Sequence, residues 1–109
     1  MAKQERIQQD IETLRRITEP CACGTQRPSY TPEYRLAIEY VKKRMKEFGL
    51  ETREDNAGNL YGVLAGTQKD APKIISGSHL DSVKCSGAYD GIAGVLCALE
   101  AARMIAESG

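Results

Sequence analysis

The feature that most constrains the fold is a helix pattern at residues 91–106 that is apolar on nearly every side. Large aliphatic side chains recur at helical spacing, and most of the remaining positions are small. A helix of this kind must be covered by a sheet and by further elements, since no broad face of it suits water. The expected buried side consists of Ile92, Val95, Leu96, Leu99, Ala102 and Ile105.

Two amphipathic helices are predicted near the start of the chain. Residues 3–18 carry Ile and Leu at steps of three and four, and Pro20 ends this helix. A second helix is expected to begin after Thr31 as its N-cap, with Pro32 in the first helical position. Gly49 is placed as the glycine that ends it.

Strands are predicted in the middle of the chain, and residues 20–30 are expected to form a loop. Residues 50–54 and 59–64 flank a turn sequence and indicate a β-hairpin. The short apolar run 73–78, bounded by turn residues, predicts a third and buried strand. The resulting order α-α-β-β-β-α is typical of the α/β class, with helices on both faces of a sheet.

The size of this sheet relative to the final helix indicates part of a larger domain. The 109 residues suggest a single domain, but three strands are few to cover the helix at 91–106. The sequence also ends where a helix would turn into the next strand. We therefore expect residues 1–109 to be the N-terminal portion of a larger domain.

Charge and hydropathy exclude several classes of partner. Lys plus Arg equals Asp plus Glu, fifteen of each, which gives no electrostatic reason to expect nucleic acid or an anionic membrane. No stretch reaches the roughly 20 apolar residues of a membrane span. The charged start of the chain lacks the apolar core of a signal peptide, so a cytoplasmic location is expected.

The four cysteines are expected to be reduced thiols, because no secretory signal is recognised. Cys21 and Cys23 form a Cys-X-Cys sequence with no matching second pair, which disfavours a four-cysteine zinc site. Cys97 lies within the final helix pattern and is expected to pack there as a small apolar residue. Cys85 is read in the same way, as an incidental thiol.

One segment carries the residues of a possible metal site. His79 is the only histidine, and Asp81 stands two residues after it, on the same side if the chain is extended. A carboxylate so placed can orient a metal-binding imidazole. Asp90 follows a glycine-containing turn and opens the apolar helix, and a carboxylate there could bridge two ions. The spacing alone also allows a satisfied polar histidine, a turn aspartate and a simple N-cap.

Two motifs resemble a known family. The segments GSHLDSV (77–83) and SGAYDGIAGV (86–95), with DNAGNLYGVLAG (55–66) before them, resemble the aminoacylase-like metallopeptidase superfamily. Within it they are most similar to allantoate amidohydrolases, N-carbamoyl-L-amino-acid hydrolases and β-ureidopropionases. The resemblance implies a three-layer α/β/α metallohydrolase domain of which this chain is one part. Ser86 stands where the family usually has glycine.

The resemblance implies roles for three residues. His79 would be a ligand of one metal ion, Asp90 would bridge two ions, and Asp81 would be the catalytic-site acid that orients His79. Gly91 would permit the tight entry into the helix. Two divalent ions, zinc or manganese, are expected in the complete enzyme, with weak or no binding by these 109 residues. The remaining ligands, a glutamate base and a dimerisation domain would lie further along, so a homo-oligomer is expected.

The expected function is hydrolysis of a C–N bond in an amide, carbamoyl or ureido group of a small molecule. N-carbamoyl or N-acyl amino acids and allantoate-like compounds are the implied substrates. The alternative is an inactive fragment that serves as a packing or self-association module. Outside the metal site, Arg27 and Glu100 are both expected to lie on the surface.

Overall fold

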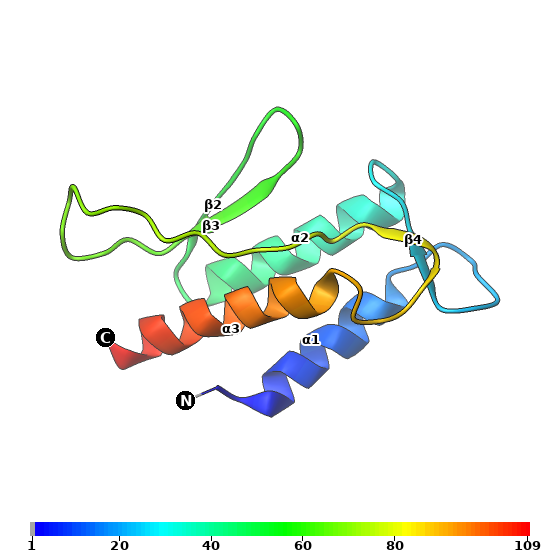
Figure 1. The fold of residues 1–109 in the computed structure, drawn as a ribbon, viewed down its shortest axis with the longest axis horizontal. Coiled ribbons are helices and arrows are strands. Elements are labelled where there is room, and N and C mark those ends of the chain that lie inside the picture. Colours follow the sequence, from blue (N-terminus) through cyan, green and yellow to red (C-terminus); the bar gives the residue numbers. More distant parts are fainter. Residues whose placement is uncertain (1) are drawn as a thin grey trace.

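The computed structural model describes residues 2–109 (Figure 1) and combines helices with short strands. Strands β1 and β4 pair in one antiparallel sheet, and β2 and β3 pair in another. This mixture confirms the predicted α/β class. The elements are α1 (Gln4–Arg16), β1 (Thr25–Arg27), α2 (Pro32–Glu47), β2 (Glu51–Glu54), β3 (Leu60–Val63), β4 (Ser82–Ser86) and α3 (Ile92–Ser108).

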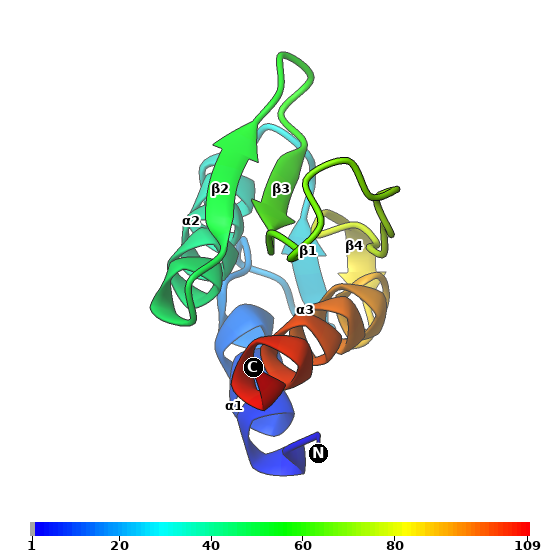
Figure 2. The same ribbon diagram turned by 90° about the vertical axis from the view of Figure 1, so that its left-hand side faces the viewer.

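The three helices share one hydrophobic core. Figure 2 shows α1 and α3 lying together, with α2 beside the β2–β3 hairpin. Only one side of α3 enters this core, so the expectation that it is covered nearly all round was wrong: Cys97 and Ile105 are exposed. The buried cluster consists of Ile11, Leu14, Ala37, Ile38, Val41, Leu80, Ile92, Leu96 and Leu99.

Local signals in the sequence placed α2 and the hairpin correctly. The Thr31 hydroxyl accepts a hydrogen bond from the backbone N–H of Tyr34 at 3.2 Å, as an N-cap does. Gly49 has φ +91°, the left-handed conformation that ends helices. In the hairpin turn the Asp55 carboxylate accepts from the backbone N–H of Ala57. These features are decided by residues close in sequence, and the predictions from them are confirmed.

The buried strand predicted at 73–78 is wrong. Ile74 and Ile75 are 99% and 83% exposed, and this segment forms no strand. A strand needs a neighbouring strand to receive its backbone hydrogen bonds, and within residues 2–109 no backbone partner pairs with this segment. The strands β1 and β4 form instead, the first of them inside the predicted loop 20–30.

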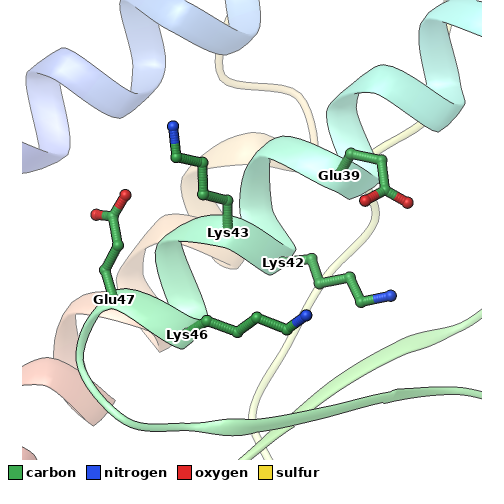
Figure 3. A pocket seen from close by; sticks show the side chains of 5 residues that line it. All are labelled: Glu39, Lys42, Lys43, Lys46 and Glu47. Carbon is green, nitrogen blue, oxygen red and sulfur yellow. The ribbon is translucent and has the colours of Figure 1, made fainter.

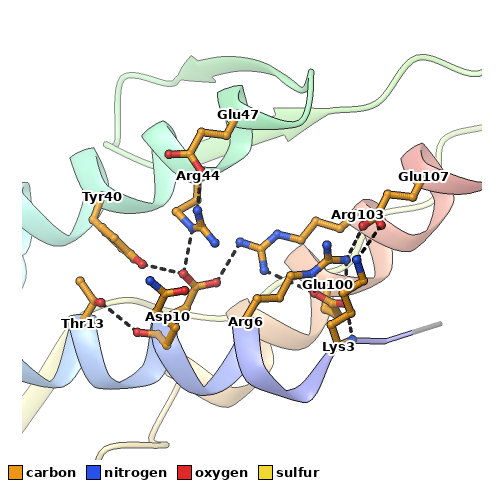
Figure 4. A network of polar contacts seen from close by, with 11 residues as sticks. Lys3, Arg6, Asp10, Thr13, Tyr40, Arg44, Glu47, Glu100, Arg103 and Glu107 are labelled. Carbon is orange, nitrogen blue, oxygen red and sulfur yellow. Dashed lines mark hydrogen bonds and ion pairs between the residues drawn. The ribbon is translucent and has the colours of Figure 1, made fainter.

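A buried aspartate on α1 ties the three helices together (Figure 4). Asp10 is fully buried. Its carboxylate accepts from the Tyr40 hydroxyl at 2.6 Å, from Arg44 Nε at 2.9 Å and from Arg103 Nη2 at 2.9 Å. A buried charge is tolerated when it is paired and hydrogen-bonded in this way. Asp10 therefore fixes α2 and α3 against α1 through polar contacts inside the core.

Glu100 belongs to the same network, so the expectation that it lies on the surface was wrong. It is 3% exposed. Its carboxylate accepts from Arg6 Nε at 2.8 Å, from Arg6 Nη2 at 2.9 Å and from the backbone N–H of Lys3 at 2.9 Å. Arg103 approaches its second oxygen at 3.3 Å. The Glu100 carboxylate thus holds Lys3 and Arg6 against α3. Glutamate side chains are usually exposed, so the sequence alone did not indicate this role.

We predict that Glu100 makes folding stability sensitive to acid. The hydrogen bonds from Arg6, with those from Lys3 and Arg103, hold the pKa of Glu100 at about 2 in the folded state, below its ordinary 4.5. Its stabilisation is therefore complete above the unfolded pKa and is lost as the pH falls toward 2. In denaturant unfolding, Glu100 should contribute up to about 3 kcal/mol to the loss of stability over this window, and this contribution should be absent in Glu100→Gln.

The exposed glutamate of α1 supplies the control. Glu12→Gln should leave the acid dependence of unfolding unchanged, because the contacts of Glu12 with Arg15 and Gln8 lie on the surface. An identical loss of stability in wild type and Glu100→Gln between about pH 5 and pH 2 would contradict the assignment.

Candidate metal site

The structure brings His79, Asp81 and Asp90 together beside the start of α3. His79 Nδ1 lies 3.2 Å from Asp81 Oδ1, and His79 Nε2 lies 3.4 Å from Asp90 Oδ1. The three side chains are 53%, 42% and 52% exposed, so the group is open to water. Both ring nitrogens therefore face a carboxylate, although the residues come from two different loops.

The surroundings of Nδ1 select one form of the imidazole. Besides the Asp81 carboxylate, the Asp81 carbonyl oxygen lies 2.9 Å from His79 Nδ1. Both neighbours are acceptors, so they favour the tautomer that carries its proton on Nδ1. The lone pair of Nε2 is then directed toward Asp90. Acceptors behind a histidine fix ligand orientation in this way in metal sites.

The distance between Nε2 and the Asp90 carboxylate fits a shared metal ion. Nitrogen and oxygen ligands lie about 2.0–2.2 Å from zinc, so two ligands at tetrahedral angles are roughly 3.3–3.5 Å apart. The observed separation is 3.4 Å. Two donors are fewer than the three protein ligands of a catalytic zinc site. Among residues 2–109, no further side chain joins His79 and Asp90 as a third ligand.

The backbone at Gly91 makes this approach possible. Gly91 has φ +74°, and a Cβ atom built there would lie 2.5 Å from His79 Cε1, Nδ1 and O. Any side chain would therefore displace the histidine. Ser86, the departure from the usual glycine, is buried, and its hydroxyl lies 3.4 Å from Asp90 Oδ2. The serine thus contacts the carboxylate oxygen of Asp90 that does not face His79.

Arg27 is a residue of this region that sequence reasoning missed. It was expected on the surface but is 1% exposed. Its guanidinium donates to the carbonyl oxygens of Leu80 at 2.8 Å, Leu14 at 2.9 Å and Ile17 at 2.6 Å. Burial lowers the pKa of Arg27, and the nearby Asp81 opposes that change. Because Leu80 stands between His79 and Asp81, Arg27 anchors the backbone that carries both.

The expectation of reduced thiols was wrong for two of the four cysteines. Cys23 and Cys85 form a disulfide, although 62 positions separate them in the sequence. The pairing of β1 with β4 brings them together, which no local pattern reveals. Cys21 and Cys97 are free, and Cys97 is exposed and not packed in the core.

A hollow on the outer surface of α2 lies on a different element from the histidine (Figure 3). It is lined by Glu39, Lys42, Lys43, Lys46 and Glu47. The side chains spread along the helix in Figure 3 and do not converge on one point. Lys42 is also paired with Glu54 at 3.3 Å. This surface has the character of a solvated helix face, and we assign no site to it.

Comparisons with known proteins agree on one family. The model of peptidase family M28 matches residues 59–109. The N-carbamoyl-L-amino-acid amidohydrolase of Paenarthrobacter aurescens is 45% identical over 108 residues, which cover 99% of this chain and 26% of that protein. The allantoate amidohydrolase of Bacillus subtilis (strain 168) is 43% identical over 98 residues, covering 90% of this chain and 24% of that protein.

Comparison of the fold with solved structures indicates the same family. The crystal structure of AtUAH in complex with glyoxylate matches with a TM-score of 0.93 and 35% sequence identity, over 100% of this chain and 26% of that one. The chain therefore belongs to the aminoacylase-like metallopeptidase and amidohydrolase superfamily, in the group that contains the N-carbamoyl-L-amino-acid and allantoate amidohydrolases. It spans about a quarter of the length of the curated relatives that it matches. In residues 2–109 we find no helix with the length and apolar character of a membrane span.

We predict that Gly91→Ala displaces His79. The added Cβ would overlap the imidazole, and the alanine would have to keep the positive φ of Gly91. We expect the two effects to lower the free energy of unfolding by about 1–3 kcal/mol. Denaturant unfolding and the ¹⁵N chemical shifts of the imidazole measure the two effects. Gly87→Ala is the matched control, because nothing lies within 4 Å of a Cβ there. Equal effects of the two substitutions would refute this role of Gly91.

We predict that Arg27→Lys loosens the backbone between His79 and Asp81. A lysine keeps the charge but cannot reach three carbonyl oxygens with one planar group. We expect a loss of roughly 2–4 kcal/mol in unfolding stability, with faster amide exchange at residues 79–82. Arg15→Lys on the exposed side of α1 should change neither quantity. Unchanged exchange at 79–82 in a folded Arg27→Lys chain would show that Arg27 has no part in positioning this segment.

Proposed function

We propose that this chain supplies part of the active site of a two-metal hydrolase that cleaves C–N bonds in carbamoyl or ureido groups. His79 would bind a divalent ion through Nε2, and Asp90 would bridge two ions. The observation that carries the proposal is the 3.4 Å separation between His79 Nε2 and Asp90 Oδ1 in a chain of this family. Zinc and manganese both accept nitrogen and carboxylate donors.

Each residue has a separate task in this proposal. Asp81 accepts a hydrogen bond from Nδ1–H with its carboxylate or its carbonyl oxygen, which would keep Nε2 free to bind. Gly91 leaves the room that the imidazole occupies. A divalent ion held there would supply Lewis acidity toward the carbonyl oxygen of the scissile bond and toward water. Asp81 acts through the histidine and not on the substrate.

The remaining groups would come from sequence that this chain does not contain. The relatives are about four times as long, and a hydrolase of this kind needs further ligands and a general base to move a proton to the leaving nitrogen. We propose that the additional length of such enzymes provides them, along with a surface for homo-oligomer formation. The substrate class follows from the names of the relatives: N-carbamoyl-L-amino acids first, and allantoate second.

One observation favours the alternative of a packing or self-association module. The residues Ile74 and Ile75 are almost fully exposed, and an apolar pair of this kind on a surface is often covered by a partner. This reading requires no metal and no hydrolysis. The chimera experiment described next separates the packing module from the enzymatic proposal.

The test is a chimera with the N-carbamoyl-L-amino-acid amidohydrolase of Paenarthrobacter aurescens. Residues 1–109 replace the matched quarter of that enzyme, and hydrolysis of N-carbamoyl-L-amino acids and bound metal are measured. We expect a metal-dependent activity that falls by on the order of 100-fold or more in His79→Ala and in Asp90→Ala. Asp81→Asn should reduce metal affinity by about 10–100-fold. Asp70→Ala, at an exposed carboxylate, is the control.

Circular dichroism and gel filtration establish whether the chimera folds, so that inactivity is interpretable. A folded chimera that retains no metal would contradict the proposed ligands. A folded chimera whose activity is unchanged by His79→Ala would contradict the role of the histidine.

A further inference from the structure

A second group of metal-binding atoms lies where β1 meets the end of β4. The Sγ atoms of Cys21, Cys23 and Cys85 all lie within 4.8 Å of one another. Cys23 and Cys85 are joined as a disulfide, and Cys21 Sγ lies 3.8 Å from Cys85 Sγ. A disulfide needs only two sulfur atoms. The third sulfur beside it makes the group one that could hold a single ion.

The backbone around the three sulfurs is shaped to bring them together. Gly24 has φ +78°, and a Cβ there would lie 2.4 Å from the carbonyl oxygen of Ser86, so only glycine allows β1 to start this close to β4. Cys85 has φ +55°, which is uncommon for a residue with a side chain. Such conformations concentrate at sites where a side chain must point in one direction. Here they aim Cys85 at the Cys-X-Cys loop.

The fourth cysteine of the chain does not belong to this group. Cys97 lies on α3, where it is free and exposed, outside this group. Cys85, 62 positions from Cys23, completes the group instead. The Cys-X-Cys spacing that disfavoured a four-cysteine site does not argue against three sulfurs, two from the loop before β1 and one from β4.

We propose that the reduced chain binds one thiophilic metal ion, zinc(II) or copper(I), through Cys21, Cys23 and Cys85. The 3.8 Å between Cys21 and Cys85 is close to the roughly 3.8 Å that separates two thiolates 2.3 Å from one tetrahedral ion. Three thiolates leave a fourth position for water on zinc, and they satisfy a three-coordinate copper(I). Thiolate ligands select these ions over magnesium or calcium.

Loading the site requires reduction of the disulfide. A phosphine and one water molecule convert the Cys23–Cys85 bond into two thiols: phosphorus takes the oxygen atom and is oxidised, and each sulfur gains one hydrogen. Metal binding then displaces the thiol protons to solvent. The disulfide and the bound ion are therefore alternative states of the same sulfurs. This inference does not depend on the hydrolase proposal, because it uses none of the same ligands.

The experiment titrates the phosphine-reduced 109-residue chain with Co²⁺ under anaerobic conditions. Cobalt(II) replaces zinc and gives sulfur-to-metal charge-transfer absorption only when thiolates bind it. We expect one cobalt per chain, displaced by Zn²⁺, and in a separate arm one copper(I) per chain. Cys21→Ser should weaken binding by on the order of 100-fold, while Cys97→Ser and His79→Ala should leave the absorption unchanged.

Cys21→Ser is the decisive variant, because Cys21 lies outside both strands and its loss spares the β1–β4 pairing. Absence of charge-transfer absorption in the reduced, folded chain would overturn the proposal. So would equal losses in Cys21→Ser and Cys97→Ser. Cobalt binding that gives no charge-transfer absorption and is lost in His79→Ala would assign the metal to the histidine site.

Discussion

The buried guanidinium of Arg27 is the interaction on which the arrangement of this chain depends. It lies on β1, is nearly inaccessible to water, and donates to carbonyl oxygens at the C-terminal end of α1 and to that of Leu80. A charge buried in this way is stable only when its donors are satisfied. The carbonyl groups at a helix C-terminus suit a cation because they form the negative end of the helix dipole. One side chain thereby joins α1, β1 and the segment that leads into β4.

The same contact couples the hydrophobic core to the candidate metal site. The side chain of Leu80 is buried in the core, while its carbonyl oxygen is held by Arg27. The neighbours His79 and Asp81 are directed away from the core and meet each other. Gly91 then admits the imidazole beside α3, which brings Asp90 into reach. Core packing, a buried cation and one glycine thus determine the distance on which the proposed chemistry rests.

The parts of the fold that could be predicted are those decided by nearby residues. Thr31 and Gly49 mark the ends of α2, and the turn after β2 contains its own capping aspartate. The strands β1 and β4 could not be found, because each is short and polar and gains its stability from a partner 55 or more positions away. The disulfide depends on the same pairing.

Burial of charged residues was missed for a related reason. A single sequence shows that Arg27 and Glu100 are charged, and charged residues are usually exposed. It does not show that Leu80 will offer a carbonyl oxygen to one, or that Arg6 will approach the other. The motifs around His79 and Asp90 identified the family correctly. The roles of those residues stay predictions, since a family likeness and a distance do not measure metal binding.

The unpaired segment before His79 and the incomplete ligand set have one explanation under the proposed function. Ile74 and Ile75 have the composition of a buried strand but find no partner strand within residues 2–109. His79 and Asp90 have the spacing of two metal ligands but find no third among the same residues. The segment runs directly into His79, so a strand paired at 74–78 would also hold the histidine from its N-terminal side. Under the proposed function, pairing of a strand at 74–78 and binding of a metal ion would each stabilise the segment that the other requires.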